Sequence, residues 1–243
     1  MLSSTGNLLI AASTLSTLLI IYSTYHSLKS KDYSITKNLV YFNLFQITLI
    51  ISSFFLLILS FVVSDFSLLS VYQNSHTSKP IFYKISGVWG NHEGSLLLWV
   101  NIMIIFSYLF FTLNRDTEKK FRLYTLLIQN ILIAGFIIFL LLDSNPFAKI
   151  IPIPNEGLGL NPILQDPALA IHPPLLYVGF VGSSIYFSAA IGAILSNING
   201  KNFASSVKFW VLISWLFQSL GIIVGSIWAY YELGWGGFWF WDP

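Results

Sequence analysis

The 243-residue sequence contains no cysteine. Without a thiol, the chain cannot form a disulfide framework, a thiolate metal site or a cysteine nucleophile. It is also poor in charge, because Lys, Arg, Asp and Glu make up only 9% of the residues, whereas soluble globular proteins carry about 25%. The formal net charge of +2 comes without a run of basic residues, so no nucleic-acid partner is expected. These absences exclude an ordinary soluble domain.

Apolar residues dominate instead, at 55% hydrophobic and 17% aromatic. A helix needs about 20 mostly apolar residues to cross the hydrocarbon core. Six segments qualify: 7–25, 39–64, 95–113, 123–142, 175–195 and 208–230. Only segments 39–64 and 208–230 are clearly overlong, so we expect them to tilt or to extend past the membrane. The predicted fold class is all-α: a polytopic membrane helix bundle of about six transmembrane helices in residues 1–230, followed by a Trp-rich loop in residues 231–243.

The basic residues predict the orientation of these spans. Lys79, Lys84 and Lys149 lie in the loops after the second and fourth spans, and the other nine of the twelve Lys and Arg residues lie after the first, third and fifth. Positive residues stay on the side of synthesis. We therefore expect the N-terminus, loops 65–94 and 143–174 and the terminal aromatic stretch to share the outer face. The first span lacks a positively charged leader region, so it is expected to remain in the bilayer rather than to be cleaved.

The first outer loop ends in "GVWGNHEGSLLLW", which contains the pair His92-Glu93. A zinc-protease helix would need a second histidine one turn later, but position 96 is Leu. A structural interpretation is available, because Glu93 at the start of the third span would be stabilised by the helix dipole. A role of the His-Glu pair in a site at the membrane boundary stays open.

The second outer loop ends in "LNPILQDPALAIHPPLLYVGFVG". Proline suits the first turn of a helix, so Pro173 and Pro174 predict that the fifth span begins there. Proline also disfavours helical geometry at the preceding residue, so we expect His172 to be extended at the edge of the helix. His172 is then either a polar boundary residue or a metal ligand, since imidazole is the commonest protein ligand for metals.

The last residues, "WAYYELGWGGFWFWDP", hold many aromatic rings beside a glycine hinge. Aromatic belts gather Trp and Tyr at membrane interfaces, but consecutive residues cannot share one helix face. A porphyrin is a flat, apolar ligand whose iron takes an axial imidazole, so the stretch favours a haem shelf next to His172. Just before it, "GIIVG" (Gly221 to Gly225) is a pattern that lets two helices approach closely. The candidate haem-binding residues are His172, which is also the candidate iron ligand, and Trp228, Trp235, Gly236, Gly237, Phe238, Trp239, Trp241 and Asp242.

These motifs resemble a known family. "WGGFWFWDP" is similar to the WWD signature of the haem-handling proteins CcmC, CcmF and CcsA/ResC, which act in cytochrome c biogenesis. "WGNHEGSLLLWV" and "LNPILQDPALAIHPPLLYVGFVG" resemble CcmF and its nitrite-reductase relative NrfE, and CcmC lacks both stretches. The resemblance runs from about residue 39 to the end. It identifies the chain as similar to the N-terminal part of a CcmF-type protein.

The resemblance implies a role in haem attachment. A CcmF-type protein receives haem b from the chaperone CcmE and, with the thiol subunit CcmH, attaches it to apocytochrome c. Haem is held only transiently at the WWD loop, between two outer histidines, and His172 matches the first of them. The second outer histidine and two membrane-embedded histidines lie beyond the matching region. The resemblance therefore implies that a C-terminal CcmF polypeptide is a partner of this chain. It also implies that this chain is one component of a haem lyase complex and is inactive alone.

Other interpretations remain open at the level of sequence. The chain could be a CcmC- or NrfE-type haem-handling protein, or a structural membrane subunit of a respiratory assembly with its aromatics as a belt. Transport is disfavoured, since no charged residue falls in the middle of a span. The abundant Phe, Ile, Leu, Ser and Asn are typical of an AT-rich organellar genome. We therefore expect a multi-pass protein of the mitochondrial inner membrane with its WWD loop in the intermembrane space, or its bacterial counterpart facing the periplasm.

Overall fold

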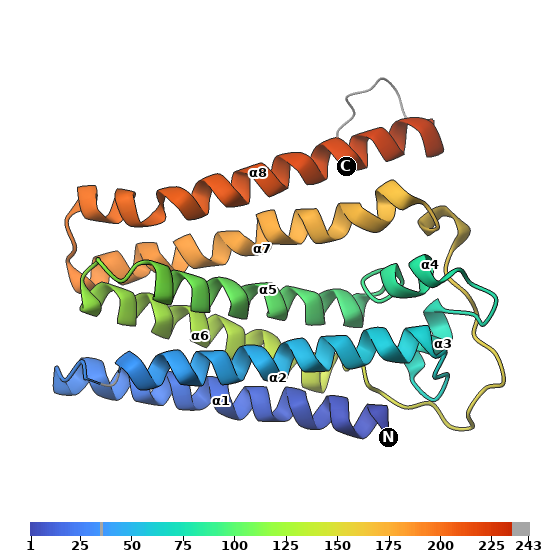
Figure 1. Cartoon of the computed structure of the whole chain (residues 1–243), viewed down its shortest axis with the longest axis horizontal. Coiled ribbons are helices and arrows are strands. Elements are labelled where there is room, and N and C mark those ends of the chain that lie inside the picture. Colours follow the sequence, from blue (N-terminus) through green and yellow to red (C-terminus); the bar gives the residue numbers. More distant parts are fainter. Residues whose placement is uncertain (35, 235–243) are drawn as a thin grey trace.

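Six long helices lie side by side and form an elongated bundle (Figure 1). The computed structural model describes residues 1–34 and 36–234. The long helices are α1 (Leu2–Ser30), α2 (Thr36–Val62), α5 (His92–Leu113), α6 (Lys119–Leu142), α7 (Pro167–Ser196) and α8 (Gly200–Glu232). All six are long and apolar enough to span a membrane, which confirms the predicted all-α, multi-pass membrane fold.

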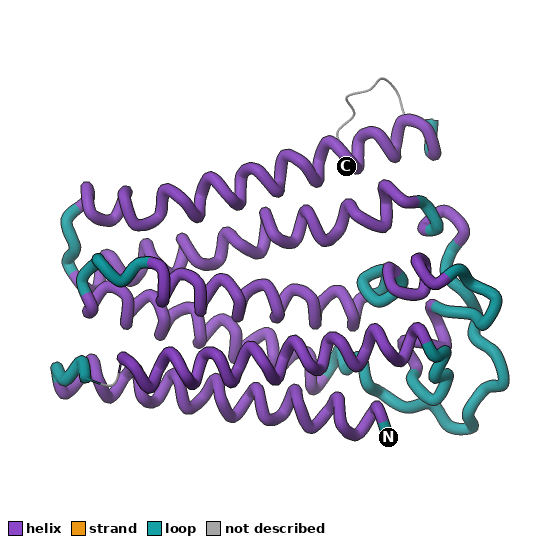
Figure 2. The backbone as a smooth tube through the Cα atoms, in the orientation of Figure 1, coloured by secondary structure: helices purple, strands orange, loops and turns teal. Residues whose placement is uncertain are grey.

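The two ends of the bundle differ. The short connections 31–34, 114–118 and 197–199 lie at one end, which we call the turn end (left in Figure 1). The N-terminus, α3 (Leu69–Asn74), α4 (Ile81–Ser86), the single turn η1 (Pro162–Leu164) and the long connection 143–166 lie at the other, the loop end. Figure 2 shows that the loop end holds most of the irregular backbone. The predicted outer loops therefore do share one end of the molecule.

Several helices are longer than their apolar runs. The α1 helix has 29 residues and α7 has 30, so both exceed α2 with its 27. The expectation that only segments 39–64 and 208–230 are overlong is therefore wrong. Hydropathy marks where a chain prefers lipid, whereas helical hydrogen bonding continues through polar residues until a cap or a turn ends it. In α1 that end is Lys31, which adopts left-handed geometry with φ 57°.

The α5 helix is the most buried of the six and α8 the least. Around α5 the interior contains uncharged polar side chains as well as apolar ones. Gln46 of α2 donates to Thr17 of α1 at 2.6 Å and to Asn130 of α6 at 3.3 Å. Ser188 of α7 donates to Gln129 of α6 at 2.8 Å. Hydrogen bonds of this kind hold helices together where lipid gives no hydrophobic drive for association.

Candidate functional site

The α7 helix begins at the loop end, well before its two prolines. Asp166 caps it by accepting hydrogen bonds from the amides of Ala168 and Leu169 at 2.8 and 3.0 Å. Pro167 then occupies the first turn, where its missing N–H costs nothing. His172 therefore lies inside α7 rather than extended at its edge, and the predicted start of this span is wrong.

The structure also shows why Pro173 and Pro174 do not end the helix. A proline inside a helix leaves a carbonyl one turn earlier without its amide donor. For Pro174 that carbonyl belongs to Ala170, and it accepts a hydrogen bond from the indole Nε1–H of Trp89 at 2.8 Å instead. Trp89 comes from the segment before α5 and so closes the gap from outside the helix. Its role was not anticipated, although it belongs to the "GVWGNHEG" motif.

The His172 imidazole is held between α7 and α8. Its Nδ1 lies 2.7 Å from the carbonyl oxygen of Gly221. Because a carbonyl only accepts, Nδ1 carries the hydrogen, and in the neutral ring the lone pair is on Nε2. A backbone carbonyl that fixes one nitrogen of an imidazole in this way is the usual support of a metal-binding histidine. His172 thus has the tautomer and the restraint of a ligand.

Space for the imidazole comes from glycine. A Cβ built at Gly225 would lie 2.4 Å from Cε1 and 2.6 Å from Nδ1 of His172, so any side chain there would displace the ring. A Cβ at Gly221 would come within 2.7 Å of the Leu176 side chain. The predicted close approach of the "GIIVG" segment to another helix is confirmed. The helix that it approaches is α7. The close approach leaves a space for the His172 ring beside Gly221 and Gly225, which we call the His172 seat.

Trp228 is the second predicted site residue that the structure describes. It follows Gly221 and Gly225 on the same face of α8, at the i, i+4 and i+7 spacing of one helical stripe. The ring is partly buried, and its Nε1–H has no hydrogen-bond partner among the described residues. A buried donor of this kind is costly unless something outside those residues accepts from it. The other predicted residues, Trp235, Gly236, Gly237, Phe238, Trp239, Trp241 and Asp242, lie outside the described residues.

Two cavities flank Trp89 at the loop end. One, of about 310 Å³, lies between α4, α7 and α8, and its walls include Phe82, Ile85, Trp89, Ile171, Leu175 and Phe217. The other, of about 360 Å³, includes Trp89, His92, Leu160, Pro173 and Tyr177. Both border the segment of α7 that carries His172. The apolar and aromatic walls suit a flat apolar ligand or its substituents.

His92 starts α5 and takes part in local structure. The Asn91 side chain caps this helix by accepting from the Gly94 amide at 2.8 Å, and Glu93 lies in the first turn as predicted. His92 Nδ1 lies 3.1 Å from the Ser144 hydroxyl, and its ring meets Phe139 edge-on. These contacts agree with the structural interpretation, although His92 also lines the second cavity.

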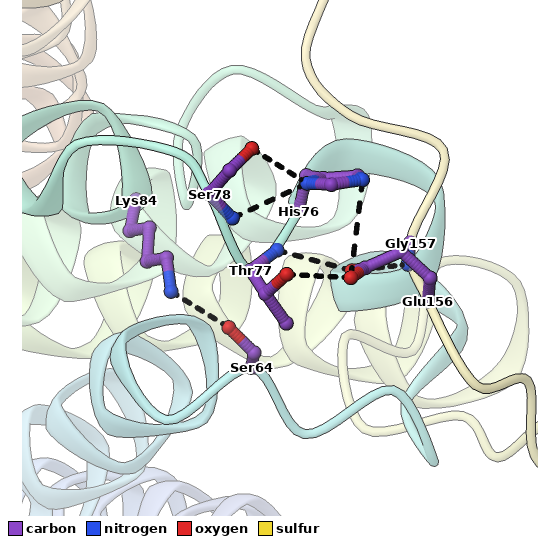
Figure 3. A network of polar contacts seen from close by, with 7 residues as sticks. All are labelled: Ser64, His76, Thr77, Ser78, Lys84, Glu156 and Gly157. Atoms are coloured by element: carbon purple, nitrogen blue, oxygen red, sulfur yellow. Dashed lines mark hydrogen bonds and ion pairs between the residues drawn. The ribbon is translucent and has the colours of Figure 1, made fainter.

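A separate polar network joins residues 76–78, between α3 and α4, to residues 156 and 157 in the long connection 143–166 (Figure 3). Glu156 accepts from the Thr77 hydroxyl at 2.5 Å and from the amides of Thr77 and Gly157 at 3.0 Å each. His76 Nε2 lies 3.9 Å from its carboxylate. The Thr77 hydroxyl and the Gly157 amide lower the pKa of Glu156 to about 2, with smaller help from His76. Among the described residues, no cluster of three or more metal-binding side chains occurs.

Comparison with known proteins gives a consistent result. Residues 89–243 match the family model described as "Cytochrome C assembly protein". The chain is 50% identical over 195 residues to the cytochrome c-type biogenesis protein CycK of Rhizobium meliloti, covering 80% of this chain and 29% of the relative. It is 45% identical over 192 residues to CcmF of Escherichia coli (79% and 30%) and 46% identical over 188 residues to NrfE of Haemophilus influenzae (77% and 30%).

A solved structure named "Cytochrome c Heme Lyase CcmF" has the same fold, with a TM-score of 0.86 at 25% identity. It matches 100% of this chain, which corresponds to 38% of the solved chain. The chain therefore matches only 29–38% of the length of these relatives. The match of residues 89–243 covers the supports of His172 described above, from Trp89 to Gly225. The chain belongs to the cytochrome c assembly protein family, in its CcmF-type branch.

Proposed function

We propose that this chain helps to hold haem at the loop end of the bundle for covalent attachment to apocytochrome c, with His172 Nε2 as one ligand of the iron. The observation that carries the proposal is the seat of His172. Gly221 fixes Nδ1, Gly225 makes room for the ring, and Nε2 keeps its lone pair. Haem b would be a cargo awaiting transfer rather than a permanent cofactor.

Two further features fit haem as the cargo. The Trp228 indole N–H is a buried donor that lacks an acceptor among the described residues, and the carboxylates of a porphyrin are suitable acceptors. The cavities beside α7 are lined mainly by apolar and aromatic side chains. A flat, apolar ligand with acidic groups at one edge fits these features better than a small polar ligand does.

The Trp-rich residues would supply the rest of the surface. Trp235, Phe238, Trp239 and Trp241 follow the loop-end terminus of α8 in the sequence. Stacking of an aromatic ring on a flat base contributes about 1–3 kcal/mol, and we assume a similar gain on a porphyrin. Gly236 and Gly237 would let the rings lie flat, and Asp242 would close the loop. Without cysteine, this chain cannot bond haem covalently, which suits release to an acceptor.

The proposal includes partners and a location. CcmE would deliver haem, a CcmH-type subunit would present the acceptor thiols, and apocytochrome c would receive it. Because a single imidazole does not complete the coordination of the iron, the remaining ligands would come from parts of a CcmF-type protein that these 243 residues do not contain. We place the loop end in the intermembrane space of mitochondria or in the bacterial periplasm, since the basic residues gather at the turn end.

The test removes the imidazole. Replacement of outer-sphere supports of a metal ligand typically lowers metal affinity about 10- to 100-fold, so we expect His172→Ala to weaken haem retention at least that much. The chain should be produced together with the CcmF-type segments that it lacks, and the Soret absorbance per purified protein measured. Gly225→Ala should give an intermediate loss, because the ring is displaced but present. Added imidazole should restore haem to His172→Gly, where a bond to the iron is the missing element.

His76→Ala is the matched control, because it removes a histidine at the same end of the molecule from a different set of contacts. An unchanged Soret band and normal cytochrome c maturation in His172→Ala would reject the ligand role. A complete absence of haem from the wild-type assembly would favour a structural membrane subunit instead.

A further inference from the structure

Arg122 is a buried cation at the turn end of the bundle. It lies in the first turn of α6, and only 7% of its surface is exposed. One arm of its guanidinium donates through Nη2 to the carbonyl of Phe111, in the last turn of α5, and the group lies 4.7 Å from the centre of the Phe111 ring. These contacts hold the guanidinium in a fixed position. They neutralise none of its charge.

No counter-charge pairs with Arg122 in the part of the chain that the structure describes. None of the carboxylates there lies within 4.0 Å of it, and its Nε has no hydrogen-bond partner. Of its charged neighbours, Arg115 adds to the positive charge around it and Asp116 partly offsets that charge without forming an ion pair. Burying an arginine without a partner is strongly unfavourable. The unpaired Nε and the positive charge therefore point to an anion that is not part of these residues.

Arg122 lines a cavity of about 340 Å³ whose composition fits an anion. Its walls are Thr36, Lys37, Val40, Tyr41, Arg115 and Arg122, so half of the lining residues are basic and none is acidic. Lys37 and Arg115 are exposed, whereas Arg122 is buried. The first turns of α2 and α6 meet the cavity, and the positive ends of helix dipoles also attract anions. A phosphate group, which takes two parallel hydrogen bonds from a guanidinium, suits this arrangement.

The depth of the site selects among phosphates. Arg122 is the fourth residue of the 24-residue α6 helix, and every charged residue of that helix lies in its first four positions. Arg122 therefore lies where the hydrocarbon core gives way to lipid head groups. Tyr41, which lines the cavity, and Phe45, one turn further into α2, are exposed at 69% and 58%. They extend an exposed apolar surface from the cavity along the outside of the bundle, toward the midpoint of its length. An acyl chain attached to the phosphate would lie against this surface.

We propose that this cavity binds the phosphate of an anionic phospholipid, with Arg122 as the buried anchor and Lys37 and Arg115 at the outer rim. Basic pockets between transmembrane helices bind such head groups in other membrane proteins. The site lies at the end of the bundle opposite His172. It does not depend on the proposed role in haem attachment.

The test measures lipid selectivity. Protein is reconstituted in vesicles of equal amounts of phosphatidylcholine and phosphatidylglycerol and extracted, and the retained lipids are counted by native mass spectrometry. We expect the wild type to retain phosphatidylglycerol preferentially. Each neutralised basic residue should lower that preference about fivefold, the effect of one basic side chain at an anionic membrane surface. Lys37→Gln/Arg115→Gln tests the rim, and Arg122→Gln tests the anchor.

Lys201→Gln/Lys208→Gln is the matched control, because it removes the same charge from the start of α8, away from this cavity. An equal loss of selectivity in this control, or none in the rim variant, would overturn the proposal. The rim variant decides the matter even if Arg122→Gln does not fold. Inorganic phosphate is tested in pure phosphatidylcholine vesicles. If phosphate alone raises the melting temperature as much as phosphatidylglycerol does, the lipid assignment is wrong.

Discussion

His172 and His76 both lie at the loop end, but their surroundings give them different capabilities. His172 donates from Nδ1 to a backbone carbonyl in a space bounded by Gly225, so its other nitrogen has one fixed direction. The side chain of His76 is 40% exposed, and its ring lies between the Ser78 hydroxyl and the Glu156 carboxylate. The first arrangement supports a ligand. The second belongs to a network that fastens one loop to another.

That network should depend on pH through Glu156. Its pKa is about 2 in the folded protein, against an ordinary value of 4.5. A lowered folded pKa stabilises the network fully above 4.5, and this contribution disappears as the pH falls from 4.5 through 2. We expect Glu156→Gln to speed amide hydrogen exchange at Thr77 and Gly157 at pH 6. The difference from the wild type should shrink through this window.

Comparing the two proteins at each pH removes the effect of pH on intrinsic exchange rates. Amides of the α5 core serve as an internal control, since they make no contact with Glu156. A difference that persists unchanged at pH 2 would show that the carboxylate charge is not what holds the loops.

At the scale of elements, α7 depends on a partner outside itself. Its first turns contain three prolines, at 167, 173 and 174. Only the first is at a position where proline is free of penalty. The other two each remove a backbone hydrogen bond, and the Trp89 indole replaces one of these by donating to the Ala170 carbonyl. The helical position of His172, and with it the imidazole seat, therefore relies on a tryptophan that lies 81 residues from Ala170 in the sequence.

Trp89→Phe should loosen the start of α7. The substitution keeps an aromatic ring but removes the N–H, which leaves the buried Ala170 carbonyl without a donor at a cost of about 1–3 kcal/mol. We expect a lower melting temperature and faster hydrogen exchange in the first turns of α7. Trp215→Phe, the same change at a residue 67% exposed on α8, should have little effect. Equal behaviour of the two variants would contradict the role assigned to Trp89.

For the molecule as a whole, the two ends of the bundle should face opposite sides of the membrane. The native chain has no cysteine, so single cysteines can be introduced and labelled without background. Asn155 at the loop end and Asn202 at the turn end are both exposed. In intact membranes, a maleimide that cannot cross the bilayer should label Asn155→Cys from the outer side. It should label Asn202→Cys only after permeabilisation, and the reverse pattern would invert the orientation that we propose.

The sequence by itself determined that the protein is a helical membrane protein and that alternate loops lie at opposite ends of the bundle. Apolar runs and their interruptions are properties of neighbouring residues, so six helices and two dissimilar ends could be predicted from hydropathy and charge. The motifs around His92 and His172 were sufficient to indicate the family. They did not give the boundaries of α7, because a rule about the residue before a proline does not include the cap at Asp166 or the distant indole of Trp89.

Only the tertiary structure decided what His172 touches and where Arg122 is buried. The imidazole meets a carbonyl 49 residues away, and its room comes from the absence of a side chain on another helix. Arg122 lies in a basic loop region that the sequence presented as an orientation signal. Its burial, without a counter-ion among the described residues, results from the packing of the α5–α6 connection and the start of α6 against the start of α2. Hydropathy is read along a segment, whereas a site depends on which faces of separate helices pack together. That packing is decided by contacts among residues far apart in the chain.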